Sequence, residues 1–159
     1  MLSVLLIGVG KLKESWEREA CAEYIKRLRR FCALEVRELP DQPEPDKPSE
    51  ALMRRVMERE GQEILSCVRA TDRVVALCIR GAAYDSEGFA QKIAAWQMDG
   101  RRLVLVIGGS LGLSDEVLAR ADEKISFSKM TFPHQLMRVI LLEQLYRGFK
   151  IGAGERYHK

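Results

Sequence analysis

The chain has 159 residues and a mass of 18.1 kDa, the size of one ordinary domain that can bury a core without disulfides or metals. Hydrophobic residues make up 47% of the sequence and charged residues 31%, a composition typical of globular rather than disordered proteins. The net charge of +3 permits a nucleic-acid partner but does not require one, because many surfaces without such a partner carry as much charge.

Four cysteines, Cys21, Cys32, Cys67 and Cys78, are widely spaced, and the sequence holds no CxxC pair and only two histidines. We therefore expect neither a zinc site nor another metal site. Reduced cysteines in a cytoplasmic protein are the expected state. Cys67 and Cys78 stand in apolar runs, which predicts that both are buried.

The first ten residues, MLSVLLIGVG, are apolar, but no basic region precedes them and Lys11 and Lys13 follow in place of a small-residue cleavage site. They predict a strand at residues 2–9 rather than a signal peptide. No window of the sequence approaches membrane-spanning length, so we expect no membrane partner.

Along the rest of the chain, short β-branched runs alternate with helical segments. This alternation predicts an α/β fold with a mostly parallel sheet and helices on both of its faces. The predicted strands are residues 2–9, 33–39, 73–79, 103–107 and 124–127. The predicted helices are residues 15–30, residues 49–68 capped by Ser49, a helix capped by Asp85 or Ser86 that ends at Met98, a short helix capped by Ser114, and residues 133–149 opened by Pro133.

One segment, residues 40–48 (PDQPEPDKP), has four prolines in nine residues. It cannot form regular structure, and we expect a surface loop. The loop is too short to divide domains, and no internal repeat is present. We therefore expect a single domain over residues 1–159.

Three of the late strands are followed by candidate ligand-binding loops. They lie after Leu77, at residues 108–112 (GGSLG) and at residues 128–132 (SKMTF). Ligands of open α/β sheets bind beyond the carboxyl ends of the strands, so all three loops are expected to build one small-molecule pocket. The adjacent glycines of GGSLG indicate close approach by a ligand or by another stretch of backbone, and their spacing differs from a dinucleotide fingerprint.

The segment GVGKLKES, residues 8–15, has the look of a phosphate loop but does not match its pattern. Leu5 and Leu12 stand where a glycine and a Ser or Thr are required. A strand-to-helix turn is the better interpretation, in which Lys11 and Lys13 remain available to an acidic partner.

The helix predicted at residues 133–149 has apolar residues on more than one face, which indicates full enclosure or a shared interface. A symmetric homodimer is the simpler interpretation. Arg138 stands inside the apolar run and needs an anionic or carbonyl partner. Either it pairs with Glu143 or another neighbour, or it holds substrate.

The two histidines are His134 and His158. His134 follows a proline, a position more typical of a helix start than of a catalyst. In the terminal GERYHK, Tyr157, His158 and Lys159 combine an aromatic ring, a titratable ring and a positive charge, which suits RNA bases. The alternative is an end that only keeps the chain soluble.

Several of these stretches closely resemble the RlmH family, the bacterial large-subunit ribosomal RNA pseudouridine N3-methyltransferases of the SPOUT class. The resemblance is carried by VIGGSLGLSDEV (residues 106–117), by ISFSKMTFPHQLMRVILLEQLYRGFKI (residues 125–151) and by the terminal YHK. It extends to GVGKLKE, EGQEIL and SEGFAQ nearer the N-terminus, and so covers nearly the whole chain.

The resemblance implies a C-terminal trefoil knot, an obligate homodimer and S-adenosylmethionine (SAM) held bent in the knotted loops. The implied substrate is 23S rRNA in the assembled ribosome. The residues implied to bind the cofactor are Leu77, Gly108 or Gly109, and the loop formed by Phe127, Ser128, Lys129, Met130, Thr131 and Phe132.

Methylation at N3 displaces a proton from the uracil ring, so a base or a donor that stabilises negative charge is wanted close by. The candidates are His158 and Tyr157 for the proton and Arg138 for negative charge on a uracil carbonyl, with His134 in reserve. The tail is free to act on the partner subunit's cofactor.

Basic residues on the first helix are available for RNA phosphates: Lys26, Arg27, Arg29 and Arg30. Two other functions remain open, a dimeric protein that binds another adenine nucleotide and a non-catalytic factor that binds ribosomes.

Overall fold

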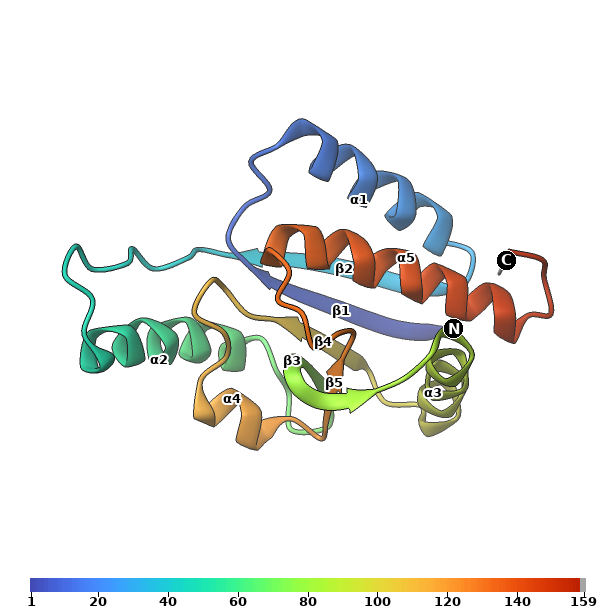
Figure 1. The fold of residues 1–159 in the computed structure, drawn as a ribbon. Coiled ribbons are helices and arrows are strands. Elements are labelled where there is room, and N and C mark those ends of the chain that lie inside the picture. The colour runs from blue at the N-terminus through green and yellow to red at the C-terminus, as the bar shows by residue number, and fades with distance from the viewer. Residues whose placement is uncertain (158–159) are drawn as a thin grey trace.

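The computed structural model of the chain describes residues 1–157. Five parallel strands form one sheet in the order β2-β1-β4-β3-β5, and helices cover both of its faces (Figure 1). The α/β prediction is therefore confirmed. The strands are β1 (Leu2–Val9), β2 (Cys32–Leu39), β3 (Arg73–Ala83), β4 (Leu103–Ile107) and β5 (Glu123–Ser126). The helices are α1 (Ser15–Leu28), α2 (Glu50–Ser66), α3 (Ser86–Asp99), α4 (Asp115–Arg120) and α5 (His134–Gly152).

The centre of the sheet is apolar on both faces, as parallel sheets require. All five residues of β4 are buried, and alternate residues of β1 enter different cores. Val4 and Leu6 face the core beneath α1, α3 and α5, whereas Leu5 and Ile7 face the core beneath α2 and α4. The two helical layers in Figure 1 follow from this alternation.

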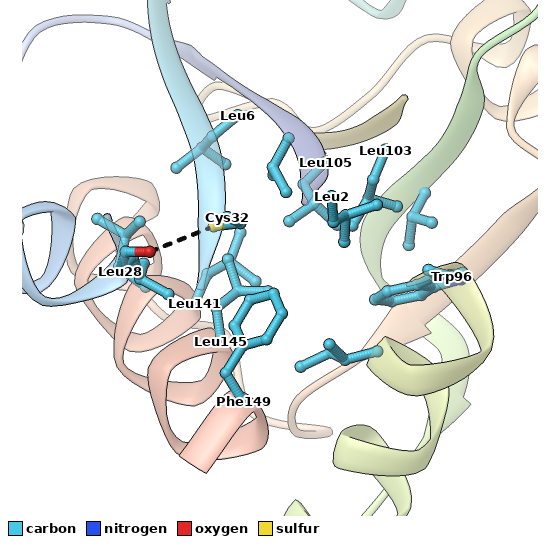
Figure 2. Packing of buried hydrophobic residues seen from close by; sticks show 14 of the residues in the cluster. Leu2, Leu6, Leu28, Cys32, Trp96, Leu103, Leu105, Leu141, Leu145 and Phe149 are labelled. Atoms are coloured by element: carbon cyan, nitrogen blue, oxygen red, sulfur yellow. Dashed lines mark hydrogen bonds between the residues drawn. The ribbon is translucent and has the colours of Figure 1, made fainter. Parts of the chain in front are cut away.

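The larger core joins α1, α3 and α5 to the sheet. Figure 2 shows Leu141, Leu145 and Phe149 of α5 beside Leu28 of α1, with Trp96 of α3 across the cluster. Each fully buried side chain of this size stabilises the fold by roughly 1.5–3 kcal/mol relative to its exposed state. The last helix of the chain is therefore an essential wall of the core.

The predicted helix caps are confirmed where polar side chains accept hydrogen bonds. Ser49 accepts from Leu52 N at 3.2 Å, and Ser114 accepts from Val117 N at 3.3 Å. Of the two candidates before α3, Asp85 is the cap and accepts from Gly88 N at 2.7 Å. Residues 40–48 form neither helix nor strand, as predicted.

Strand β3 runs four residues beyond the predicted end at Ile79. Both Leu77 and Ala82 pair with Ile125 of β5, because residues 78–81 leave the regular register between them. A Cβ atom on Gly81 would lie 2.5 Å from the backbone carbon of Ile125, so only glycine fits at this crossing. The predicted strand ended at Ile79, whereas β3 continues through Gly81 and its pairing with β5 resumes at Ala82.

The prediction that Cys67 and Cys78 are buried is wrong. Both are half-buried, since Cys67 caps the end of α2 and Cys78 lies in the irregular part of β3. The buried thiols are those of Cys21 and Cys32, and burial raises the pKa of each to about 11.

No helix within residues 1–157 is long and apolar enough to cross a membrane. Over the same residues, no group of three or more His, Cys, Asp or Glu side chains is arranged to hold a metal ion.

Candidate functional site

A cavity of about 950 Å³ opens where β3, β4 and β5 end. Its volume lies at the upper end of the range typical of small-molecule sites, roughly 300–1,000 Å³. The lining comes from residues 77–80, 107–113, 124–128 and 130–135, together with Leu118 and Met137. The three predicted loops therefore meet in one place, beyond the carboxyl ends of parallel strands.

The glycine loop after β4 folds back on itself. Gly112 N donates to Gly109 O at 3.0 Å, and Gly112 has a φ of +87° that favours glycine. A Cβ atom on Gly108 would lie 2.9 Å from the backbone of Gly112. The sequence suggested that the adjacent glycines allow close approach either by a ligand or by backbone, and the approach seen is by backbone of the same loop. Residues 108–112 also line the cavity.

The loop after β5 is held by two serines. Ser126 Oγ donates to Ser128 O at 2.9 Å, and Ser128 Oγ accepts from Met130 N at 3.0 Å. Phe127 packs edge-on against Phe89 of α3, with ring centroids 5.5 Å apart. Of residues 127–132, all but Lys129 line the cavity.

His134, at the first position of α5, also lines the cavity. Burial lowers its pKa, and the positive charge of Arg138 lowers the pKa further. A Cβ atom on Gly10 would lie 3.5 Å from His134 Nε2, so the loop after β1 passes beside the ring. The lowered pKa favours the neutral imidazole, which has one ring nitrogen free to accept a proton.

Arg138 is 2% exposed and is not among the residues that line the cavity. It forms an ion pair with Glu38 of β2, and its Nη2 donates to Gly10 O at 2.9 Å. The sequence left open whether Arg138 pairs with Glu143, with another neighbour or with substrate. In the structure its ionic partner is Glu38, while Glu143 pairs with Arg147 at 2.6 Å.

The tail lies against the C-terminal half of α5. Tyr157 packs edge-on against Tyr146, with centroids 4.9 Å apart, and its hydroxyl donates to Glu143 at 3.4 Å. Burial raises the pKa of Tyr157 to about 12. Glu155 pairs with both Arg30 and Lys150. These contacts fasten the tail to α1 and α5 of its own chain.

The tail follows the C-terminal end of α5 (Figure 1), whereas the residues of α5 that line the cavity belong to its N-terminal end. Met137 lines the cavity, whereas Tyr146 holds Tyr157 nine residues later. A rise of 1.5 Å per residue separates these two positions by about 13 Å along the helix axis. Of the three candidate catalytic residues within residues 1–157, only His134 lines the cavity of its own chain. The fourth candidate, His158, lies outside the described residues.

The sequence reasoning did not identify Glu60, a carboxylate that is 5% exposed beneath the glycine loop. A Cβ atom on Gly109 would lie 3.1 Å from Glu60 Oε1, and burial raises the pKa of Glu60. Glu60 accepts from Gln42 N at 3.1 Å, and Ser110 Oγ donates to Glu44 at 2.6 Å. These bonds place residues 40–48 beside the glycine loop. Glu60 is the first residue of EGQEIL, one of the stretches that carry the family resemblance, and this was the feature of the sequence that could have identified it.

Comparison with protein families gives a match to the model described as "Predicted SPOUT methyltransferase" over residues 2–158. Proteins named "Ribosomal RNA large subunit methyltransferase H" are 52% identical in Clostridium novyi, 50% in Bifidobacterium adolescentis and 48% in Bacillus cytotoxicus. Each alignment spans 159 residues, 99% of this chain and the whole of the relative.

Among solved structures, a probable methylase family protein from Haemophilus influenzae has a similar fold, with a TM-score of 0.54. The similarity covers 99% of this chain and 70% of that protein at 14% sequence identity, so it supports the fold alone.

Proposed function

Because this chain belongs to the SPOUT methyltransferase family, we propose that it transfers a methyl group from SAM to N3 of a pseudouridine in 23S rRNA of the assembled ribosome. The observation that carries this proposal is 48–52% identity, over 159 residues, to relatives named for methylation of large-subunit ribosomal RNA. A ribosomal substrate implies that the protein works in the cytoplasm.

The cavity suits SAM in size and chemistry. Its volume of about 950 Å³ accommodates a nucleoside with a side chain, and the apolar side chains of Leu77, Ile107 and Phe127 offer contacts for an adenine ring. Backbone of the loops at residues 108–112 and 127–132 runs along the same walls, where peptide groups can bind the polar edge of the base. Leu77, Gly108 or Gly109, and residues 127–132 are the proposed cofactor site.

Bound SAM supplies an electrophilic methyl group, so the protein's main tasks are to align the uracil ring with it and to exclude water. The N3 proton must leave during transfer, and a base at the cavity is required. The lowered pKa of His134 favours its neutral form, and the residue lines the cavity. His158 and Tyr157 of the tail are the other proposed acceptors.

Arg138 is buried and does not line the cavity, but it bonds to residues that lie beside the cavity wall. Its guanidinium holds Glu38 and the carbonyl of Gly10, and the turn that follows passes beside His134. We therefore assign Arg138 a positioning role for the wall that holds His134.

The tail is proposed to act at the cavity of a partner subunit. Within one chain it is fastened to the far part of α5, about 13 Å along the axis from Met137. Leu136, Val139, Ile140 and Tyr146 of α5 remain only half-buried in the single chain, which suits a shared face. A homodimer built on α5 would bring one tail to the other chain's cavity.

The proposal is tested by incubating the purified protein with methyl-labelled SAM and ribosomes that lack the modification. We expect label in 23S rRNA at one pseudouridine, located by digestion and mass spectrometry. Ribosomes that already carry the methyl group are the matched control and should take up none.

Two other outcomes would contradict the proposal. Binding of SAM without transfer to any ribosomal RNA would indicate a nucleotide-binding protein. Binding to ribosomes with no heat from SAM in calorimetry, on a folded sample, would indicate a non-catalytic factor.

A further inference from the structure

The turn at residues 10–13, between β1 and α1, lies behind His134 of the cavity wall and does not itself line the cavity. Gly10 lies beside His134, since a Cβ atom on Gly10 would lie 3.5 Å from His134 Nε2. His134 in turn lines the cavity. The turn therefore lies one residue away from the cavity, within reach of a strand whose nucleotide occupies the cavity beside His134.

Groups of β2 and α5 fix the beginning of this turn. Gly10 N donates to Leu39 O at 2.7 Å, and Gly10 O accepts from Arg138 Nη2 at 2.9 Å. Glu38 pairs with Arg138 and also accepts from Leu12 N at 3.4 Å. The turn is thus joined to β2 and α5, elements that are distant in sequence.

An exposed arginine fixes the end of the turn. Arg18 Nη1 donates to Leu12 O at 2.9 Å and to Lys13 O at 2.8 Å. Arg18 stands near the start of α1, so the helix and the turn are held as one unit. Neither of these bonds involves the side chain of Lys11 or Lys13.

Holding the turn in this way has an energetic cost. Arg138 is 2% exposed, and its Nε has no hydrogen-bond partner within residues 1–157. A buried donor without a partner costs about 1–3 kcal/mol, and Glu38, the ion-pair partner of Arg138, is 40% exposed, which weakens its attraction to the guanidinium. The guanidinium is therefore better explained by what it positions than by the stability it adds.

The turn presents two ammonium groups, those of Lys11 and Lys13. Both residues are exposed, and neither has a carboxylate partner within the described chain. Many other basic side chains are paired, for example Arg27 with Glu23 and Arg30 with Glu155. Two unpaired charges on a fixed backbone form an arrangement suited to anions.

We propose that Lys11 and Lys13 bind phosphate groups of the RNA strand next to the nucleotide that enters the cavity, and that Arg18, Arg138 and Glu38 hold them in place. The inference rests on the proposed function. RNA is favoured over an acidic protein because a nucleotide in the cavity carries its own neighbouring phosphates past this turn. Asp41 also lies near Gly10, so the contact depends on placement rather than on a broadly positive surface.

The test compares the double variant Lys11→Ala/Lys13→Ala with the wild-type protein in steady-state methylation of unmodified ribosomes. We expect KM for ribosomes to rise about tenfold and the slope of log K against log salt to become shallower by about 1.4, the value for two single-strand phosphate contacts. The kcat and the calorimetric affinity for SAM should stay within about twofold of wild type, because the lysines do not line the cavity.

The matched control is Lys47→Ala/Arg54→Ala, which removes the same charge from exposed positions just before α2 and on α2. It should leave KM and the salt slope near their wild-type values. Equal losses in both double variants, or no loss in the first, would overturn the inference while the wild type still methylates ribosomes. Failure of the wild type to methylate would instead refute the proposed function.

A second comparison separates RNA from protein as the partner. The Lys11→Ala/Lys13→Ala variant should also bind protein-free 23S rRNA more weakly than wild type. A loss confined to intact ribosomes would point to a ribosomal protein and would refute the phosphate assignment.

The positioning role of Arg18 has its own readout. Arg18→Met keeps the aliphatic stem and removes both bonds to the turn, so KM should rise while the salt slope stays near wild type. A slope shallower by about 0.7 would mean that Arg18 itself contacts a phosphate.

Discussion

His134 is the residue whose chemistry depends most on where the fold places it. Burial and the nearby charge of Arg138 lower its pKa from the ordinary value of 6.5. The unfolded chain therefore takes up the proton first as pH falls below about 6.5, and the free energy of unfolding decreases until the pH reaches the lower pKa of the folded state.

Replacing His134 with glutamine should remove this contribution. The wild-type protein should lose more stability than His134→Gln between pH 7.5 and pH 5, as measured by urea unfolding at each pH. His158→Gln, which changes the other histidine, is the control. Parallel pH profiles for wild type and His134→Gln would contradict the lowered pKa.

The four cysteines offer a chemical probe of the cavity. Cys21 and Cys32 are buried with a pKa of about 11 and should resist alkylation in the folded protein. Cys67 and Cys78 are both half-buried, but only Cys78 lines the cavity. We expect iodoacetamide to modify Cys67 and Cys78.

SAM at ten times its Kd should slow labelling of Cys78 about tenfold and leave Cys67 unchanged, because only the unbound protein exposes the cavity. Peptide mapping by mass spectrometry measures both rates in one sample. Equal protection of the two thiols would indicate a general tightening of the fold, and no protection would place the cofactor elsewhere.

At the scale of elements, the crossing of β3 and β5 is the most constrained point of the sheet. A Cβ atom on Gly81 would lie 2.5 Å from backbone of Ile125, which cannot move aside as a side chain can. We expect Gly81→Ala to lower the free energy of unfolding by about 1–3 kcal/mol through this overpacking.

Gly152→Ala is the matched control for this substitution. Gly152 ends α5 and does not have a positive φ, and a Cβ atom added there would meet no other atom within 4 Å. Alanine at this position should be neutral or stabilising by up to about 1 kcal/mol. Urea unfolding measures the free energy of unfolding of both variants. Equal losses would contradict the close approach of β3 and β5 at Gly81 as the cause of the destabilisation.

Elements defined by local pattern were predictable from the sequence. The predicted bounds of β1 and β4 match the structure, because a continuous apolar run between turn residues is typical of a buried parallel strand. The extension of β3 was not predictable, since it depends on pairing between Ala82 and Ile125, more than forty positions apart in the chain.

Some features of the candidate site were likewise predictable from the sequence and others were not. Convergence of the three loops follows from parallel strands alone, so the meeting of Leu77, Gly108 and Phe127 was predictable. The positions of Glu60 against Gly109 and of Arg138 against Gly10 were not. Each of those contacts joins separate elements through a side chain that has several possible partners in the sequence.

At the scale of the whole molecule, the separation of tail and cavity predicts an active homodimer. Sedimentation should give twice the mass of the 18.1 kDa chain. His158→Ala should keep SAM affinity and lose methyl transfer, since the residue is proposed to act on the substrate rather than on the cofactor. Unchanged turnover would remove the tail from the reaction.

Mixed dimers test whether the tail acts across the interface. Ile79 is 51% exposed and lines the cavity, so Ile79→Arg should fold yet repel the positively charged cofactor. Neither Ile79→Arg nor His158→Ala should methylate alone. Dimers of one chain of each kind should recover activity, because one intact cavity meets one intact tail, and no recovery would mean that each tail serves its own chain.

The position of α5 in the core has a consequence for the protein's own synthesis. Leu141, Leu145 and Phe149 close one face of the sheet, and they are translated after all five strands. Until they emerge, β1 and β4 are left with bare apolar surface, so a nascent chain that stalls before residue 134 cannot reach the native state. Such fragments should be substrates for chaperones and proteases, and this face of the sheet can reach its native packing only after α5 has been translated.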